Sequence, residues 1–368
     1  MNLLKKPFSI SLQALAGVLI FSCLLAHPFS EAASSPPGDK RDYMLVLNTY
    51  TESAPWSSHI INSIVAHIDQ VDNFEVYTEN MNSLLMTFKK HKTGEIESFK
   101  NNLLREYGKN PPRMLVLLGA PIAVLRDFVK QTWPGVPLIL CSEMDYIGPE
   151  NAYLDRRPLR PSRGARLPLC DKAVSDNITL IRTPLYLREN VELMRRMIPG
   201  MDSLIFVGDG RYINQQADSD LRELLDREFP QIDYRFYSAH EMSTEALLDS
   251  LNRIDIHRTG ILFSSWHYTK KIGDNIVSVT DSYRVIASVQ APMFALMPAD
   301  IRDGGLVGGY VYDDAEVNAH VISTIDAVLA GHQPRDIPFY APQDARPVFN
   351  YAALERKDLS PHTCPAHT

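Results

Sequence analysis

Short apolar runs alternate with amphipathic segments through much of the chain. Tyr43–Leu47, Arg113–Leu118 and Val136–Cys141 are apolar runs of strand length, and the segments between them carry apolar residues at helical spacing. Continuous apolar runs of this kind are typical of strands buried on both faces of a parallel sheet. The alternation therefore predicts an α/β fold with helices on both faces of the sheet.

A stretch rich in proline and arginine interrupts this alternation. Residues 148–172 contain four prolines and five arginines, without a helical pattern and with no aromatic residue among the arginines. Such a composition predicts an irregular, solvent-exposed insertion where the chain crosses between two lobes, and favours this over an anion-binding segment. The alternation then resumes, with strands predicted at Ser203–Val207 and Gly260–Ser264.

The last third of the chain repeats the pattern around glycines. The apolar run Pro292–Pro298 precedes two Gly-Gly pairs, and both pairs lie in the second run, Gly304–Tyr312. A helical pattern follows over Asp313–Ala330 and ends at Gly331, a typical helix terminator. The order predicts a strand, a turn, a second strand and a helix.

This C-terminal order resembles the end of the substrate-binding proteins of ABC transporters with the type I periplasmic fold. The resemblance is strongest to the versions that serve as extracytoplasmic input domains of bacterial sensor kinases. Val136–Leu140 and Met197–Asp209 resemble further segments of that family, so the resemblance covers roughly Tyr43 to Leu359. It implies two Rossmann-like lobes with parallel sheets, joined by a hinge that the chain crosses several times.

The resemblance and the pattern together predict a division of the chain. The expected parts are a signal peptide at 1–32, a linker at 33–42, a first lobe at 43–147 plus about 290–330, an insertion at 148–172, a second lobe at 173–289 plus about 331–359, and a disordered tail at 360–368.

The N-terminal residues have the layout of a secretory signal peptide. Lys5 and Lys6 precede the apolar run Ala14–Ala26, and small residues follow at Ser30–Ala32. An uncleaved membrane anchor is the alternative, because the apolar stretch approaches the ~20 residues that cross a bilayer. The sequence therefore predicts an exported, periplasmic protein, in which Cys141 is a buried thiol and its pairing with Cys170 stays open.

Composition and motifs argue against several function classes. The net charge of −7 is modest and spread over 368 residues, which disfavours a nucleic-acid surface. No nucleophile elbow, zinc-protease motif, phosphate-binding loop or dinucleotide fingerprint occurs, and the histidines are scattered. The sequence thus predicts no catalysis, cofactor or metal; an exported hydrolase using Ser265 with His267, or Ser53 with Glu52, is the remaining enzymatic alternative.

Polar and aromatic residues follow the predicted strands in both lobes, where open α/β sheets bind their ligands. The candidates in the first lobe are Thr49, Tyr50, Thr51, Ser53, Trp56, Gly119, Ala120, Ser142 and Glu143. Those in the second lobe are Asp209, Tyr212, Ser265, Trp266 and Tyr268. We expect Trp56 and Trp266 to sandwich a planar ligand between the lobes.

The resemblance implies a binding protein that closes on a small ligand, which we expect to be amino-acid-like or a small aromatic or polar compound. Its partner would be an ABC permease, to which it delivers the ligand. The alternative is a ligand-sensing input module, or partner, of a two-component sensor kinase. The identity of the ligand and the oligomeric state stay open.

Overall fold

The computed structural model describes most of the chain that follows the N-terminal segment. The described residues are 42–52, 54–83, 92–149, 152–153, 163–169, 177–272, 275–302 and 305–357. The predicted signal peptide, nearly all of the linker, the tail and Ser53 lie outside them. Within the described residues, no helix is long and apolar enough to cross a membrane.

The first sheet of the described chain contains five parallel strands in the order β2-β1-β3-β4-β7. These strands are β1 (Asp42–Asn48), β2 (Phe74–Asn80), β3 (Met114–Leu118), β4 (Leu138–Ser142) and β7 (Ile178–Arg182). All residues of β3 and β4 are buried, as their continuous apolar sequences predict.

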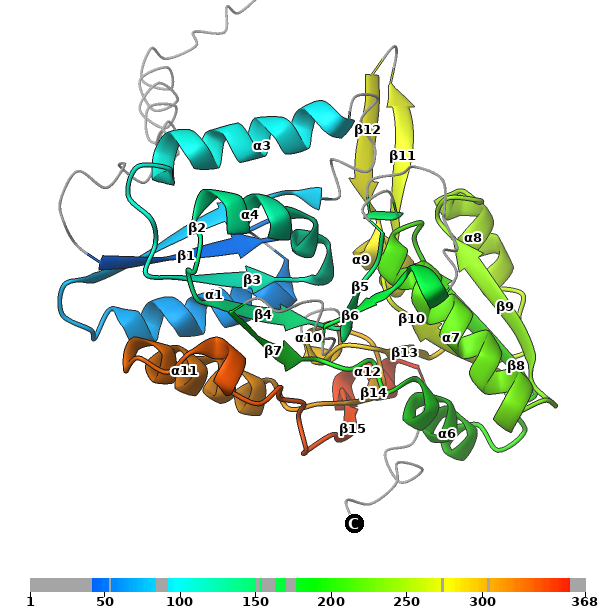
Figure 1. The fold of residues 1–368 in the computed structure, drawn as a ribbon. Coiled ribbons are helices and arrows are strands. Elements are labelled where there is room, and N and C mark those ends of the chain that lie inside the picture. The colour runs from blue at the N-terminus through cyan, green and yellow to red at the C-terminus, as the bar shows by residue number, and fades with distance from the viewer. Residues whose placement is uncertain are drawn as a thin grey trace, which may run out of the picture. The chain divides into compact units, whose positions relative to one another are not determined.

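Helices cover both faces of this sheet (Figure 1). Leu45 and Leu47 point to one face, which packs against α3 (Lys92–Tyr107) and α4 (Arg126–Thr132). Val46, which lies between them in sequence, points to the other face. That face packs against α1 (Pro55–Ile68) and α11 (Asp314–Leu329). The alternation of side chains along a strand thus gives the first lobe two apolar layers.

The second sheet has six strands in the order β15-β14-β13-β10-β8-β9. They are β8 (Ser203–Gly208), β9 (Asp233–Ser238), β10 (Thr259–Phe263), β13 (Met293–Ala295), β14 (Gly308–Val311) and β15 (Arg346–Phe349). The five consecutive pairings are parallel except that of β14 with β15, which is antiparallel.

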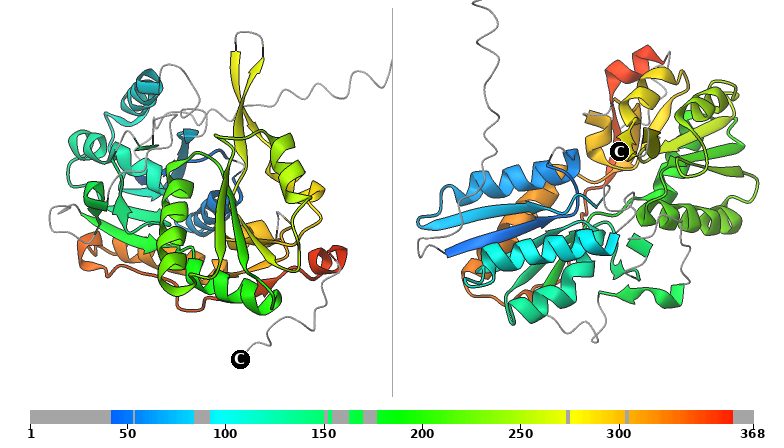
Figure 2. Two further views of the ribbon diagram at one scale, coloured as in Figure 1. Left: turned by 90° about the vertical axis from the view of Figure 1, so that its right-hand side faces the viewer. Right: turned by 90° about the horizontal axis from the view of Figure 1, so that it is seen from above.

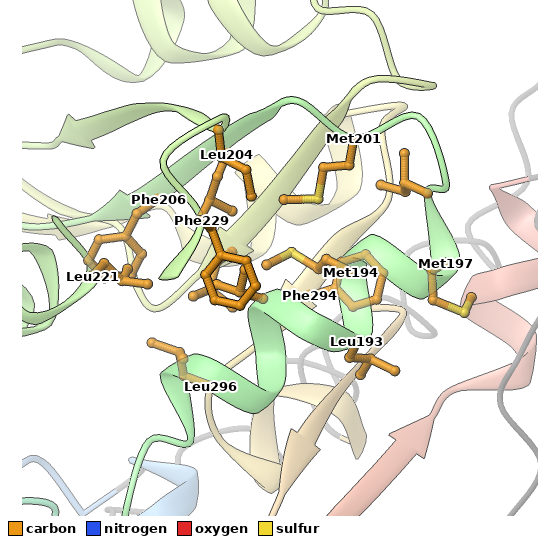
Figure 3. Packing of buried hydrophobic residues seen from close by; sticks show 14 of the residues in the cluster. Leu193, Met194, Met197, Met201, Leu204, Phe206, Leu221, Phe229, Phe294 and Leu296 are labelled. Carbon is orange, nitrogen blue, oxygen red and sulfur yellow. The ribbon is translucent and has the colours of Figure 1, made fainter. Parts of the chain in front are cut away.

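Apolar layers also lie on both faces of the second sheet. One face packs against α6 (Leu187–Met197), α7 (Tyr212–Glu228) and α12 (Tyr351–Arg356). Figure 3 shows this layer, in which Leu193, Met194 and Met197 of α6 lie in one cluster with the rings of Phe206, Phe229 and Phe294. The other face packs against α8 (Thr244–Leu251), α9 (Ser282–Ser288) and α10 (Pro298–Arg302).

Strand pairing corrects two expectations about where the chain changes lobes. The segment 148–172 is not the crossing, because the chain returns from it to form β7, which pairs with β4 in the first sheet. The run at Pro292–Leu296 does not return to the first lobe, because β13 pairs with β10. The chain therefore passes between the two lobes three times: after β7, after β14 on its way to α11, and before β15.

Two hairpins stand outside the main sheets. β11 (His267–Ile272) and β12 (Asn275–Thr280) form an antiparallel pair that projects from the second lobe (Figures 1 and 2). β5 (Tyr146–Ile147) and β6 (Leu167–Pro168) form a shorter antiparallel pair, which lies between β4 and β7 in the sequence.

The Asn190 side chain takes the place of a neighbouring strand for Tyr310. Its Oδ1 accepts a hydrogen bond from Tyr310 N at 2.8 Å, and its Nδ2 donates to Tyr310 O at 2.9 Å. The side chain is fully buried. A buried backbone amide and carbonyl thus depend on one side chain of α6.

Asn190→Ala is expected to lower the free energy of unfolding by about 2–4 kcal/mol, because both Tyr310 backbone groups lose their partner. Urea denaturation measures the loss. Asn101→Ala, on the exposed surface of α3, is the control and should change little. A loss below about 1 kcal/mol for Asn190→Ala would show that the backbone of β14 does not need this side chain.

Candidate functional site

A cavity of about 430 Å³ lies where the strand ends of both sheets approach one another. Its first-lobe lining is Tyr50, Thr51, Ala54, Pro55, Trp56 and Glu143. Its second-lobe lining is Arg211, Ile213, Ser264, Ser265, His267, Thr280 and Tyr283, with Met297, Ala299 and Asp300 near α10. The size and mixed lining are those of a site for a small organic molecule.

The loop after β1 is held by its own hydrogen bonds. Asn48 Oδ1 accepts from Tyr50 N at 3.1 Å, and Asn48 Nδ2 donates to Asn80 Oδ1 at 2.8 Å. Thr49 Oγ1 donates to Gly119 O at 3.2 Å. Gly119 has φ +90°, and a Cβ there would lie 2.9 Å from Thr49 Oγ1, so only glycine fits. These contacts fix the Tyr50 side chain at the cavity.

Two aromatic residues form the apolar part of the first-lobe wall. The Trp56 and Tyr50 rings meet edge to face, with centroids 5.8 Å apart. Trp56 Nε1 donates to Tyr312 Oη at 3.0 Å, which ties the start of α1 to the segment after β14. The indole therefore has a defined orientation before any ligand binds.

Glu143 is a buried carboxyl group, and only one of its two oxygens accepts a hydrogen bond. Its Oε1 accepts a hydrogen bond from Tyr50 Oη at 3.0 Å, and the residue is only 6% exposed. Its Oε2 has no hydrogen-bond partner among the described residues. Burial raises the pKa of Glu143, although the Tyr50 hydroxyl and the Arg211 guanidinium oppose the shift. An oxygen of this kind can accept a hydrogen bond from a donor group of a ligand.

Asp209 organises the second-lobe wall from a fully buried position after β8. Its Oδ1 accepts from Arg211 N, Arg211 Nε and Asn214 Nδ2 at 3.0, 2.9 and 2.8 Å. Its Oδ2 accepts from Ser265 Oγ at 2.9 Å and lies 3.0 Å from His267 Nδ1. Burial alone would raise the pKa of Asp209, but Arg211 and His267 hold it below its ordinary value.

The Arg211 guanidinium is fixed in the cavity wall by this carboxylate. Its Nη2 donates to Ser265 Oγ at 2.7 Å, while its Nε faces both Asp209 oxygens. Burial lowers the pKa of Arg211, but the attraction of Asp209 raises it by more. The side chain therefore presents a permanent, oriented positive charge to the cavity.

The ring of His267 is neutral near pH 7. Burial lowers its pKa to about 4 despite the nearby Asp209 carboxylate. Because Asp209 is ionised and the ring is neutral, the proton must lie on Nδ1, which donates to Asp209. His267 thus anchors the base of the β11–β12 hairpin to the same carboxylate that holds Arg211.

The structure places the sequence-predicted residues in three groups. Those that line the cavity are Tyr50, Thr51, Trp56, Glu143 and Ser265. Those that lie at the strand ends but outside the lining are Thr49, Gly119, Ala120, Ser142 and Asp209. Those whose side chains pack elsewhere are Tyr212, Trp266 and Tyr268. Ser53 lies outside the described residues.

Trp266 is not an aromatic wall of the cavity, contrary to the sequence-based expectation. Its side chain is 0% exposed, and its Nε1 donates to Thr244 Oγ1 at 3.1 Å. After β10 the chain turns through two serines. Both serines line the cavity, whereas the Trp266 side chain lies in the apolar layer beneath α8 and α9.

Several lining residues escaped the sequence reasoning. Arg211 follows Asp209 by two residues, with Gly210 between them. A basic residue so close to an acidic residue at a strand end is a signal that could have identified it. His267 belongs to the strand-end residues that follow Gly260–Ser264, so its place in the sequence did carry a signal. Tyr283 and Met297 carry no local signal, because only the tertiary fold brings them to the cavity.

Within the described residues, no group of three or more His, Cys, Asp or Glu side chains is placed to hold a metal ion. Cys141 is a buried free thiol, and Cys170 lies outside the described residues.

Comparison with known proteins defines the fold. No family model matches this sequence. No curated protein matches it either. Solved structures do: an ABC domain in complex with L-Trp from Streptococcus pneumoniae is 13% identical, covers 89% of this chain and 96% of its own, and has a TM-score of 0.57.

Two further structures extend this likeness. An ABC transporter solute-binding protein from Bacillus halodurans with bound myo-inositol is 10% identical, covers 87% of this chain and 99% of its own, and has a TM-score of 0.53. The fructose-binding periplasmic domain of a hybrid two-component system is 12% identical, covers 86% and 93%, and has a TM-score of 0.51. The chain therefore has the two-lobed type I periplasmic binding fold, as the sequence predicted.

Trp266→Ala is expected to lower the free energy of unfolding by about 3–5 kcal/mol, because it empties a large volume in the second-lobe core. Chemical denaturation measures this loss. Tyr283→Ala removes an aromatic ring that is 61% exposed and serves as the control, with a change within about 0.5 kcal/mol. Equal, small losses in the two variants would contradict a packing role for Trp266.

His267 should make stability fall as the pH falls from about 6.5 toward 4. The unfolded chain binds a proton at the ordinary histidine pKa, whereas the folded chain resists protonation until about 4. His267→Asn keeps a donor for Asp209 but does not titrate. The stability difference between parent and variant is expected to shrink by about 2–3 kcal/mol between pH 7 and pH 4.5, measured by urea denaturation. A difference independent of pH would mean that the ring has the same pKa in the folded and the unfolded chain.

Proposed function

We propose that this protein is an exported solute-binding protein that holds a small ligand between its two lobes. The carrying observation is the cavity to which Glu143 and Arg211 contribute from opposite lobes, each oriented by neighbouring side chains. Proteins of the same fold have been solved with L-Trp and with myo-inositol, and another is named as fructose-binding. A fold similarity of this kind supports the class of function without naming the ligand.

The cavity chemistry favours a ligand with an apolar, flat body and two different polar ends. Glu143 Oε2 offers a free acceptor to an ammonium or hydroxyl group. The Arg211 guanidinium, on the opposite wall, suits a carboxylate or another acceptor. Trp56, Tyr283 and Met297 add apolar surface to the lining of the same cavity. An amino-acid-like or small aromatic compound with polar groups has this arrangement.

Ligand binding would favour approach of the lobes. A ligand that contacts both Glu143 and Arg211 gains more interactions when the two walls are close. This difference in interaction energy is what a ligand needs to shift a conformational equilibrium.

Two outputs follow from such a binding event. Delivery to an ABC permease is the first candidate, supported by the solute-binding proteins among the similar structures. Input to a two-component sensor kinase is the second, supported by the periplasmic domain of a hybrid two-component system. The signal-peptide pattern at the N-terminus supports a periplasmic location for both.

The site geometry does not support the hydrolase alternative that uses Ser265 with His267. The Ser265 hydroxyl donates to Asp209 and accepts from Arg211 and Asn214, and His267 Nδ1 bonds to the same Asp209 carboxylate. A nucleophilic serine would instead need its hydroxyl bonded to a general base that Asp209 orients. Ser265 and His267 therefore act as parallel supports of Asp209, and we propose a binding protein without catalysis.

Glu143→Gln is expected to weaken ligand binding at least tenfold, about 1.4 kcal/mol, because an amide NH2 group, which cannot accept a hydrogen bond, replaces one of the carboxyl oxygens. A thermal-shift screen of amino acids, aromatic acids and sugars first identifies a ligand, which at 100 times its Kd stabilises the fold by about 2.7 kcal/mol. Calorimetric titration then compares the variant with the parent.

Glu97→Gln is the matched control, since Glu97 lies on α3 in an exposed pair with Lys100. Its affinity should equal that of the parent. Unchanged affinity in Glu143→Gln would remove Glu143 from the ligand site, and a screen without any stabilising compound would count against the proposed function itself.

A further inference from the structure

A short segment between β4 and β7 links the two lobes outside the main hinge. It comprises the β5–β6 pair and the described residues around it, 146–149, 152–153 and 163–169. We call this segment the strap. It begins and ends in the first lobe, yet it lies against α7 of the second lobe (Figure 1).

The first strap contact packs backbone and ring together. The Tyr153 ring meets the Tyr212 ring edge to face, with centroids 4.9 Å apart. Tyr153 Oη accepts a hydrogen bond from Gly148 N at 2.9 Å. A Cβ on Gly148 would lie 2.4 Å from a Tyr212 ring carbon, so the approach of strap and α7 requires a glycine there.

The second strap contact centres on Arg166, which the sequence had placed on a solvated surface. Its guanidinium carbon lies 4.6 Å from the centroid of the Tyr146 ring. Its Nη2 donates to Gln216 Oε1 and lies 3.6 Å from Asp220 Oδ1, both on α7. The Arg166 side chain is only 15% exposed, so these interactions are partly shielded from water.

The strap and the cavity share the same backbone. Tyr212, which receives the first contact, directly follows Arg211 of the cavity wall. Tyr146, whose ring packs against the Arg166 guanidinium within the strap, follows Glu143 by three residues. Any movement that separates Arg211 from Glu143 must therefore stretch the strap contacts as well.

We infer that the strap restrains the separation of the lobes, holding them close in the absence of ligand. The three connections between the lobes form a hinge, and the strap adds side-chain contacts between the lobes, beside the contact of Arg302 on α10 with His59 on α1. Opening the cavity breaks the contacts of Arg166 with α7 and of Tyr153 with Tyr212. This inference concerns the ligand-free protein and does not depend on the nature of the ligand.

Small-angle X-ray scattering of the ligand-free full chain tests the strap. Arg166→Ala and Gly148→Ala are expected to increase the radius of gyration, the first by removing contacts and the second by pushing Tyr212 away. Thermal unfolding of each variant verifies that it is folded. If Arg166→Ala does not fold, Gly148→Ala alone carries the test.

The chain offers a matched control for each variant. The guanidinium carbon of Arg222 lies 4.8 Å from the centroid of the Tyr234 ring, and its Nε lies 3.0 Å from Asp218 Oδ1. These are the same kinds of contact as those of Arg166, but they lie within the second lobe. Gly94 has no atom within 4 Å of its hypothetical Cβ. Arg222→Ala and Gly94→Ala should leave the radius of gyration unchanged. The inference is overturned if the strap variants scatter like the parent, or if Arg222→Ala expands the protein as much as Arg166→Ala.

Discussion

The buried carboxylate of Asp209 is the interaction on which the second-lobe wall depends. A charge removed from water is costly unless hydrogen bonds and opposite charge replace its hydration. Here the end of β8 supplies the carboxylate, and groups from the next turn, from α7 and from the loop after β10 satisfy it. Each donor is thereby oriented in return. Arg211, Ser265 and His267 have fixed positions in the cavity because one anion needs all of them.

The two walls of the cavity use their carboxyl groups differently. Both oxygens of Asp209 accept hydrogen bonds from other side chains of the protein, and its pKa is lowered. Its carboxylate therefore orients those side chains and has no oxygen left for a ligand. Glu143 has a partner on one oxygen, and burial raises its pKa. An unpaired buried oxygen costs stability, and a ligand that donates to it recovers that cost. We therefore propose that Glu143 and Arg211 recognise the ligand and that Asp209 holds Arg211 in place.

The sequence predicted the layers of the fold better than the allocation of strands between them. Apolar runs such as Tyr43–Leu47 identify buried strands locally, because burial on both faces leaves no polar positions. Which sheet a strand joins depends on distant partners, and β7 and β13 were misplaced for that reason. At the site, Tyr50, Glu143 and Ser265 could be predicted from their place at strand ends. The direction of Trp266 could not, since it depends on a two-residue turn.

The strap shows the same limit and adds a consequence for binding. Arg166 was expected in solvent because nothing near it in sequence can pair with it; its partners Gln216 and Asp220 lie some fifty residues further along the chain. Once formed, these contacts restrain the separation of Arg211 and Glu143. A ligand that bridges those residues then needs little movement of the lobes. Less conformational freedom is lost on binding, so more of the contact energy appears as affinity.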